Sequence, residues 1–423
     1  MFIQQKPHSQ TNLPANQGSN MYIQRHKQQL LFLMILLLFV SQACTDIFVP
    51  GLPEMSHEFA SSIKQMNLTI SVYIYAQAFF FLIIGVISDL FGRRRVLLAC
   101  IPLQIIASFA IAMTNSLTLL IILRVIQALG SSAIYIVLRL VIKDTLNKEE
   151  QIHATGMLLI GLVLSPALAP VIGAHLINWW NWRACFILIG VSMTGLVIWL
   201  AILLPETNLR IQQFRNEFSF KAQLANYTGV LQDRLFIMLI ILVGGTFASY
   251  YGFIAISSYM YIDEYHTSNT LYSYTYVAIA AAYLLGNRIM LWLNKEQVRP
   301  WRIIQYGLII SCIGVTVMIS SLFGQTHIFL ILGLATFGSL LIRLATAFIN
   351  PPIQVLVMNY FGNAGSNAIG LLSCLQYVFA GFGTAVVSGL PFAPSVNLVV
   401  SSILFTLISL VGYYFCPHSK IQH

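Results

Sequence analysis

The chain has 423 residues, of which 58% are hydrophobic and only 8% are charged. Soluble globular chains carry about 25% charged residues, so this composition excludes a water-soluble fold and indicates an integral membrane protein. The formal net charge of +9 is better explained by loop residues that orient the chain in the bilayer than by nucleic-acid binding, because the sequence contains no soluble basic module.

The cysteines and histidines provide no pattern typical of a metal or redox site. The six cysteines are scattered singly, and the nine histidines lack the H-x-x-H and HExxH spacings that zinc sites use. We therefore expect no metal and no cofactor.

Hydropathy predicts twelve membrane spans between two polar ends. Residues 1–27 are polar and rich in Gln and Asn, so we expect a disordered cytoplasmic tail. The apolar run that follows is about 23 residues long, which is too long for a signal peptide and fits a spanning helix. The first six spans, within residues 28–204, are Leu30–Pro53, Met66–Phe91, Val96–Met113, Leu117–Ile142, Ile152–Ile177 and Ala184–Leu204.

The first predicted span contains Asp46, the only carboxylate placed well inside any span. It precedes Pro53 by seven residues, which places it about 10 Å from the outer surface at 1.5 Å per residue. A charge at that depth is costly and by default marks a functional site. The alternative is a structural ion pair or a helix cap near the outer end of the span.

Residues 85–95, between the second and third spans, form the pattern G-x-x-x-D-x-x-G-R-R-R. It contains Gly85, Asp89, Gly92, Arg93 and Arg94. The glycines allow a sharp turn and a close helix approach. Arginines alone would indicate a charge cluster that stops translocation, but the spaced aspartate and glycine do not follow from topology.

The fourth span carries Arg124 near its start, seven residues after Leu117. Because the first and fourth spans run in opposite directions, Arg124 and Asp46 lie at a similar depth and can pair. The alternative for Arg124 is a side chain that extends to the outer interface. In the fifth span, Pro166, Pro170 and Gly173 disrupt the helix ladder and permit close packing.

A polar linker, residues 205–233, divides the spans six and six, and it has the composition for a short amphipathic surface helix. The second half, residues 234–416, contains Leu235–Ile262, Thr270–Leu293, Ile303–Phe323, His327–Asn350, Ala364–Leu390 and Ser395–Phe415, before a cytoplasmic tail of residues 417–423. Two halves of six helices favour an all-α integral membrane fold of two six-helix bundles around a central cavity.

Charge distribution orients these spans. If both termini are cytoplasmic, 17 of the 22 Lys and Arg residues fall in cytoplasmic segments, and only Lys64 and Arg183 fall in outer ones. Arg124, Arg139 and Arg343 lie within spans. This excess of positive charge on one side is a strong topology signal.

The predicted cavity has few candidate lining residues. Tyr73, Gln77, Tyr250 and Tyr251 are aromatic or amide side chains within spans, and we expect them to line it. Arg343, seven residues before Asn350, is expected to extend to the cytoplasm or to pack against neighbours. If it lines the cavity instead, an anionic substrate is favoured over a cationic drug.

The loop of residues 85–95 closely resembles the signature loop of major facilitator superfamily transporters. The resemblance implies the major facilitator fold, with Asp89 and Arg93 bracing the two bundles in the outward-facing state. Lys143-Asp144 resembles the partner charges of this loop.

Further motifs resemble the Bcr/CflA branch of drug:proton antiporters. They are the T-D-x-x-x-P-x-L-P run at Asp46, the R-x-x-Q element at Arg124 and the A-P-x-x-G element at Pro170. Ala128 and Ala174 replace motif glycines. The resemblance covers about residues 28–416 and implies export of small molecules against proton entry.

We therefore expect a secondary active efflux transporter in the inner membrane that works by alternating access. Asp46 would carry the proton or bind substrate, with Arg124 modulating it. The expected partners are a small-molecule substrate, protons and the lipid bilayer, without nucleic acid, and the expected state is a monomer. Dedicated export of a metabolite such as a siderophore is the nearest alternative, and a channel or a membrane-bound sensor or enzyme is an alternative from another class.

Overall fold

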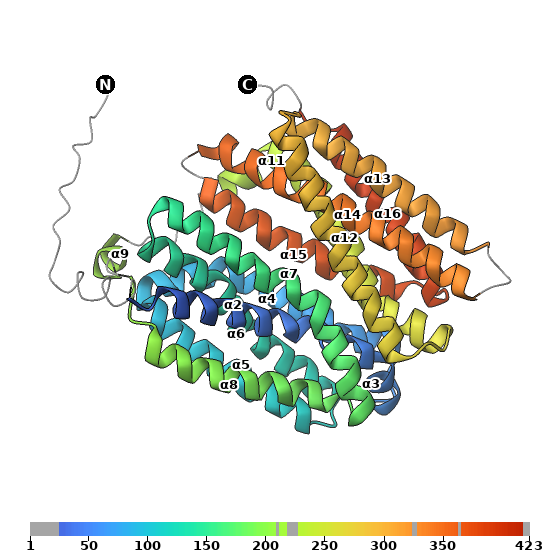
Figure 1. Ribbon diagram of the computed structural model, residues 1–423, viewed down its shortest axis with the longest axis horizontal. Helices are drawn as coiled ribbons and strands as arrows, with labels where there is room; N and C mark the ends of the chain where they lie inside the picture. The colour runs from blue at the N-terminus through green and yellow to red at the C-terminus, as the bar shows by residue number, and fades with distance from the viewer. Residues whose placement is uncertain (1–24, 209–210, 218–226, 324–327, 363–364, 418–423) are drawn as a thin grey trace.

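The computed structural model describes residues 25–208, 211–217, 227–323, 328–362 and 365–417, and these residues are helical apart from short turns. Within them, twelve helical segments are long and apolar enough to cross a membrane, which confirms the predicted fold class. Figure 1 shows these helices packed side by side along the molecule.

The first six spans have the following bounds: α2 (Lys27–Asp46), α4 (Ile63–Phe91), α5 (Arg93–Met113), α6 (Leu117–Thr145), α7 (Lys148–Trp179) and α8 (Arg183–Leu203). The last six are α11 (Arg234–Ser258), α12 (Asn269–Lys295), α13 (Pro300–Ser321), α14 (Ile328–Phe361), α15 (Gly365–Gly389) and α16 (Pro394–Tyr414). Between them, α9 (Ile211–Glu217) is a short helix in the linker. The predicted tails lie almost wholly outside the described residues.

Side-chain caps fix where several spans begin. The Ser62 hydroxyl accepts the Gln65 N–H while the Gln65 side chain accepts the Ser62 N–H, which is a capping box at the start of α4. Asn147 and Glu150 form the same arrangement at the start of α7. The Asp233 carboxylate accepts two backbone N–H groups of α11. These polar residues end the loops because they satisfy N–H groups that a helix start leaves free.

The sequence predicted the first span as one helix, but the structure shows a break within it. The α-helical pattern of α2 ends at Asp46, a 3-10 turn η1 follows at Val49–Gly51, and α3 (Leu52–Glu58) completes the span. Pro50 and Pro53 account for the break, because each removes a backbone donor from the helix ladder. Asp46 therefore lies at a helix end within the membrane.

The predicted end of the tenth span at Asn350 was wrong. Helix α14 continues through Pro351 and Pro352 to Phe361. The continuation buries Ile353 and Val357 in an apolar core, and this packing outweighs the local cost of two prolines. Neighbouring helices make proline tolerable within membrane helices.

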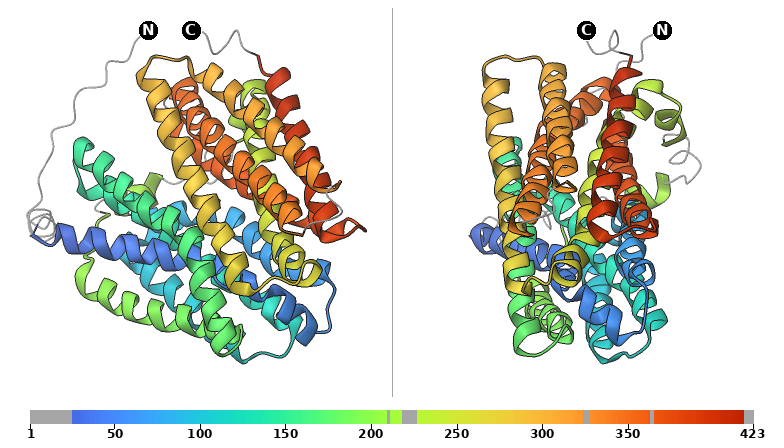
Figure 2. Two further views of the ribbon diagram at one scale, coloured as in Figure 1. Left: turned by 45° about the vertical axis from the view of Figure 1, so that its right-hand side comes forward. Right: turned by 90° about the vertical axis from the view of Figure 1, so that its right-hand side faces the viewer.

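The two sets of six helices meet along two seams. Helix α4 packs against α15, and α7 packs against α12. At one end of the molecule, α3 also contacts η2 (Tyr259–Glu264), a π-helical extension of α11. Figure 2 shows the two sets converging at the α3 end and spreading apart toward the opposite end.

Hydrogen bonds between the two sets of helices lie near the α3 end. The Asn67 side-chain amide of α4 donates to the Ala255 carbonyl at 2.9 Å and to the Ser388 hydroxyl at 2.7 Å. Ser71 of α4 is hydrogen-bonded to Thr384 of α15. These buried polar contacts between halves hold the molecule closed at this end.

Candidate functional site

Asp46 lies at the end of α2 and is only 1% exposed. Its Oδ2 atom is buried and has no hydrogen-bond partner in the described part of the chain. An ionised carboxylate in such a place is costly unless another group satisfies it. The side chain therefore has the character of a group that binds a proton or a hydrogen-bond donor.

Arg124 of α6 is fully buried, so the alternative that it extends to the outer interface is wrong. Its Nε donates to the Thr69 carbonyl at 3.0 Å. Its Nη1 donates to the Cys44 carbonyl at 2.8 Å and to the Gln127 side chain at 2.6 Å. The guanidinium carbon also lies 4.2 Å from the centre of the Tyr73 ring. Arg124 thus ties α6 to α2 and α4, two residues away from Asp46 along α2.

Asp46 and Arg124 do not form the ion pair that their matched depth suggested. Neither residue is among the ion pairs of the described residues. Arg124 directs three donors at carbonyl and amide oxygens instead. The guanidinium still acts electrostatically on the Asp46 carboxylate, as does that of Arg343. Asp46 thus lies within electrostatic reach of an arginine from each half of the chain.

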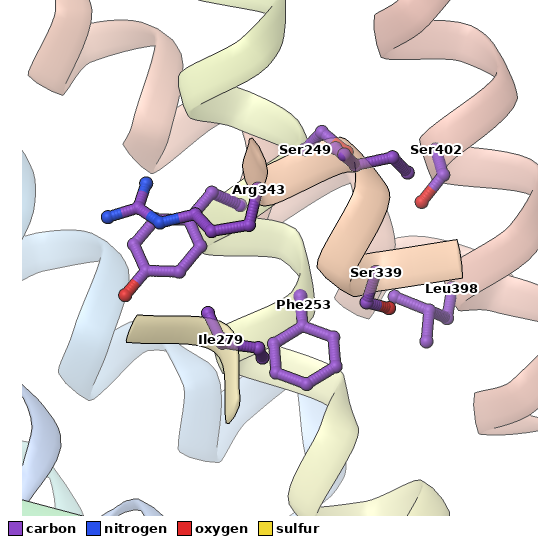
Figure 3. A pocket seen from close by; sticks show the side chains of 9 residues that line it. Ser249, Phe253, Ile279, Ser339, Arg343, Leu398 and Ser402 are labelled. Carbon is purple, nitrogen blue, oxygen red and sulfur yellow. The ribbon is translucent and has the colours of Figure 1, made fainter. Parts of the chain in front are cut away.

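Arg343 of α14 does not extend to the cytoplasm. Its guanidinium carbon lies 3.7 Å from the ring centre of Tyr250 and 4.6 Å from that of Tyr283. It lines a small pocket between α11, α12, α14 and α16 (Figure 3). Arg343 thus packs against tyrosines rather than extending to the cytoplasm, and the alternative that it lines the central cavity stays a prediction.

The four predicted cavity residues have different surroundings. Tyr73 is fully buried beneath Arg124, and Gln77 is buried within α4. Tyr250 lines the pocket with Arg343, and its ring centre lies 5.4 Å from that of Tyr251. Of the four, Tyr250 therefore lies against Arg343, and Tyr251 lies beside Tyr250.

An aromatic row that was not expected from the sequence crosses from one half to the other. The Tyr251 ring centre lies 6.1 Å from that of Tyr377, which lies 5.0 Å from that of Phe81. The Phe81 ring stacks on Tyr135 at 5.0 Å. The Arg139 guanidinium carbon lies 4.1 Å from the centre of the Tyr135 ring and closes the row. The signal available in sequence was the presence of tyrosines within spans.

The fifth-span motif has a packing role beside Asp46. Pro166 and Pro170 lie inside α7, which continues through both. A Cβ atom at Gly173 would overlap the carbonyl oxygen of Ile47, the residue after Asp46. Gly173 therefore lets α7 approach the chain directly beside the buried carboxylate.

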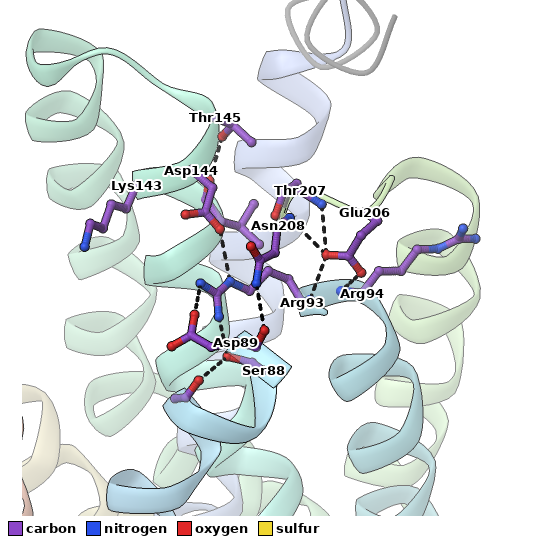
Figure 4. A network of polar contacts seen from close by, with 12 residues as sticks. Ser88, Asp89, Arg93, Arg94, Lys143, Asp144, Thr145, Glu206, Thr207 and Asn208 are labelled. Carbon is purple, nitrogen blue, oxygen red and sulfur yellow. Dashed lines mark hydrogen bonds and ion pairs between the residues drawn. The ribbon is translucent and has the colours of Figure 1, made fainter. Parts of the chain in front are cut away.

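The signature loop forms an ionic network around the buried Arg93 side chain (Figure 4). The Arg93 side chain donates to Asp89 Oδ1 at 2.6 Å, to Asp144 Oδ2 at 3.0 Å and to the Ser88 hydroxyl at 2.6 Å. The structure thus brings together three residues that the motif proposed. The Arg94 side chain donates to a carbonyl oxygen of α8 at 2.8 Å.

Glu206, just after the sixth span, was not singled out in sequence. Its carboxylate accepts the backbone N–H groups of Arg93 at 2.8 Å and Arg94 at 3.3 Å, at the start of α5. Gly92 has φ +100°, and a Cβ atom there would overlap this carboxylate. Gly85 lies within α4 and is not needed for the turn, since a Cβ atom there would reach only ordinary contact. An acid near a helix start, where free N–H groups attract negative charge, was the available signal.

Comparisons with known proteins agree with this architecture. A family profile described as Major Facilitator Superfamily matches residues 34–385. The chain is 31% identical over 178 residues to Multidrug resistance protein D of Escherichia coli strain K12, covering 42% of this chain and 45% of that relative. It is 25% identical over 311 residues to Multidrug resistance protein MdtM of the same strain, covering 73% of this chain and 75% of that relative. The match thus spans just under half of the first relative and three quarters of the second.

Solved structures show the same fold at low sequence identity. A bacterial homologue of the human lysosomal transporter Spinster, inward-facing and unoccupied, has a TM-score of 0.71 at 13% identity, covering 97% of this chain and 98% of that one. A D-xylose-proton symporter has a TM-score of 0.68 at 15% identity, covering 92% and 98%.

Proposed function

The chain belongs to the major facilitator superfamily, and we propose that it exports drugs or small metabolites from the cytoplasm in exchange for protons. Family and relatives make it a transporter rather than an enzyme. The observation that carries the proposal is the buried Asp46 carboxylate, which has one oxygen without a partner among the described residues and lies within electrostatic reach of an arginine from each half. The Bcr/CflA-like motifs around it and the multidrug resistance proteins among its relatives support efflux.

The proposed orientation places both termini and the signature loop on the cytoplasmic side of the inner membrane. The excess of Lys and Arg in the corresponding loops supports it. The contacts between halves at the α3 end then close the outer side. The conformation is accordingly inward-facing, ready to take substrate from the cytoplasm as a monomer.

A single carboxylate is sufficient for the exchange that we propose. Ionised Asp46 binds either a proton or a donor group of the substrate, and one occupant excludes the other. A proton arriving from the outer side displaces substrate outward. Its release to the cytoplasm restores the charged acid. Burial favours this alternation, because an unsatisfied charge in a membrane interior is costly.

The signature loop acts in this proposal as a gate rather than a binding site. In the inward-facing state its contacts lie within the first six spans and the linker, through Arg93, Asp89, Asp144 and Glu206. When the halves rock together at the cytoplasmic side, the same charged cluster meets the second half. The loop thereby acts on turnover without touching substrate.

Proton release from purified protein tests the role of Asp46. A substrate found by a resistance or metabolite-export screen should release protons from the parent protein in weakly buffered detergent. Asp46→Asn should abolish that release and the concentration of substrate by proteoliposomes under a proton gradient. Asp263→Asn, in η2 at the proposed outer side of the molecule, is the matched control and should behave like the parent. If Asp46→Asn still releases protons and concentrates substrate, Asp46 is structural.

A further inference from the structure

We propose that the preferred substrates are amphoteric organic molecules, with a hydrogen-bond donor or ammonium group for Asp46 and an anionic group for Arg343, both carried by an aromatic body. This inference rests on the proposed transport function and names the substrate class of the same site. It follows from complementary unsatisfied atoms, from the charge of the site and from the aromatic rings beside Arg343.

The two halves present opposite unsatisfied atoms. Asp46 Oδ2, from the first half, is a buried acceptor to which no described residue donates. Arg343 Nε, from the second half, is a buried donor without an acceptor in the same part of the chain. The two residues act on each other electrostatically, but they are not among the ion pairs that the described residues form. A buried polar atom left unpaired costs about 1–3 kcal/mol, so a ligand that supplies one donor and one acceptor removes both costs.

The charge of the site also favours an anionic group. Arg124 and Arg343 each carry a positive charge, whereas Asp46 is the one carboxylate among the described residues that acts on both. Three N–H groups of Arg124 are directed at neutral oxygens of its own half, and its Nη2 atom has no hydrogen-bond partner among the described residues. The site therefore has an excess of positive charge, and a buried unpaired charge is more costly than an unpaired neutral group.

Arg343 is held in a position to receive that group. The rings of Tyr250 and Tyr283 pack against its guanidinium plane, which leaves the edge of the plane free to bind a carboxylate or phosphate with two parallel hydrogen bonds. Figure 3 shows its terminal nitrogens pointing away from Ser339, Ser402 and Leu398 in the interior of the second half. The guanidinium therefore faces out of the second half.

Aromatic rings begin beside Arg343 and continue into both halves. Tyr250 and Tyr251 continue into the row that runs through Tyr377 and Phe81 to Tyr135. Aromatic rings favour offset or edge contacts with other rings, worth about 0.5–1.5 kcal/mol each beyond burial. An aromatic group of a substrate bound at Arg343 therefore has ring partners close by, beginning with Tyr250.

Equilibrium binding to purified protein in detergent tests the inference with four fluorescent probes that share one aromatic body. They are Nε-dansyl-lysine (zwitterion), dansylglycine (anion), dansylcadaverine (cation) and dansylamide (neutral). The zwitterion should bind at least about tenfold more tightly than the other three, because it can make one charge-assisted hydrogen bond to Asp46 and another to Arg343. Equal affinities, or tightest binding of the cation, would overturn the proposal.

Two substitutions test which side chain binds which charged group of the probe. Arg343→Gln should weaken Nε-dansyl-lysine and dansylglycine by at least about tenfold and leave dansylcadaverine unchanged. Asp46→Asn should weaken Nε-dansyl-lysine and dansylcadaverine and leave dansylglycine unchanged. Arg302→Gln, at the start of α13, is the control for loss of a positive charge. An Arg343→Gln protein that binds dansylglycine like the parent would overturn the assignment.

Folding and transport are measured separately from binding. A size-exclusion profile and a melting temperature like those of the parent establish that each variant is folded. If Arg343→Gln does not fold, Arg343→Lys, which keeps the charge, replaces it in the assay. Binding needs no proton gradient. The binding assay therefore tests the charge preference by itself. Failure of proton-driven transport with intact binding would count against the proposed function alone.

Discussion

At the scale of single residues, Arg124 links three helices around the candidate site. Its buried guanidinium donates to two backbone carbonyls, of Thr69 and Cys44, and to the Gln127 side chain. A lysine ammonium is a point charge on a flexible stem and cannot reproduce this planar set of donors. The residue therefore positions Asp46 through α2 rather than pairing with it.

We predict that Arg124→Lys lowers both stability and coupling. Each buried carbonyl left without its donor costs about 1–3 kcal/mol, so the melting temperature in detergent should fall. Arg139→Lys, an exposed position on the same helix, should leave it unchanged. Proton release on substrate addition should decrease in Arg124→Lys only. A parent-like melting temperature in Arg124→Lys would show that these hydrogen bonds contribute little.

Sequence could predict Asp46 and Arg124 because charges deep in a membrane span are rare and costly. It could not decide the direction of Arg343, since a side chain seven residues from a predicted helix end can either extend to the interface or turn inward. The predicted end of α14 was also wrong. The helix continues eleven residues beyond Asn350, so Arg343 is much farther from the helix end than expected. Glu206 was missed because its role depends on the tertiary contact with α5.

At the scale of helices, Gly173 controls how closely α7 approaches the first span. A Cβ atom at Gly173 would overlap the Ile47 carbonyl, whereas a Cβ atom at Gly156 on the same helix meets nothing within 4 Å. Small residues at such contacts let membrane helices pack closely. The two glycines thus provide a matched pair for substitution.

We predict that Gly173→Val displaces α7 from the chain beside Asp46, with a large loss of transport and a lower melting temperature. Overpacking typically costs about 1–3 kcal/mol. Gly156→Val should change neither quantity by a comparable amount. Proteoliposome uptake and thermal unfolding of both proteins provide the measurement. Equal effects of the two substitutions would mean that helix propensity, and not the contact with Ile47, explains the loss.

Hydropathy predicted the helices themselves well, since only an apolar stretch of about 20 residues satisfies its own backbone in lipid. The predicted starts agree to within a few residues where caps such as Ser62 and Asn147 stand. The break after Asp46 was not expected, although Pro50, Gly51 and Pro53 mark it. The composition of a span sets its length, whereas its internal breaks depend on individual residues.

At the scale of the whole molecule, the six-and-six division followed from the polar linker, but the conformation did not. Hydropathy is the same in every state of a rocking transporter, so it does not indicate which end is closed. The structure shows that the α3 end is closed, because Asn67, Ser71, Thr384 and Ser388 join the halves there. This closure predicts the effect of a cross-link.

We predict that a covalent link between Asn67→Cys and Ser388→Cys holds the protein in the conformation described here. The two side chains are in direct contact, with the Asn67 amide nitrogen 2.7 Å from the Ser388 hydroxyl, so oxidation should join them. Alternating access requires this end to open. Transport by the linked protein should therefore stop, and a reducing agent should restore it. Substrate binding from the cytoplasmic side should persist throughout.

The control is a pair within one half, Ser56→Cys and Ser61→Cys, whose parent residues are hydrogen-bonded at 2.7 Å. Linking this pair constrains the loop after α3 but joins no helix of the first half to the second. Oxidation should leave its transport intact, as it should for each single cysteine variant. Continued transport by the fully linked Asn67→Cys/Ser388→Cys protein would show that the α3 end does not open during transport, and the rocking of two six-helix halves would then have to be abandoned.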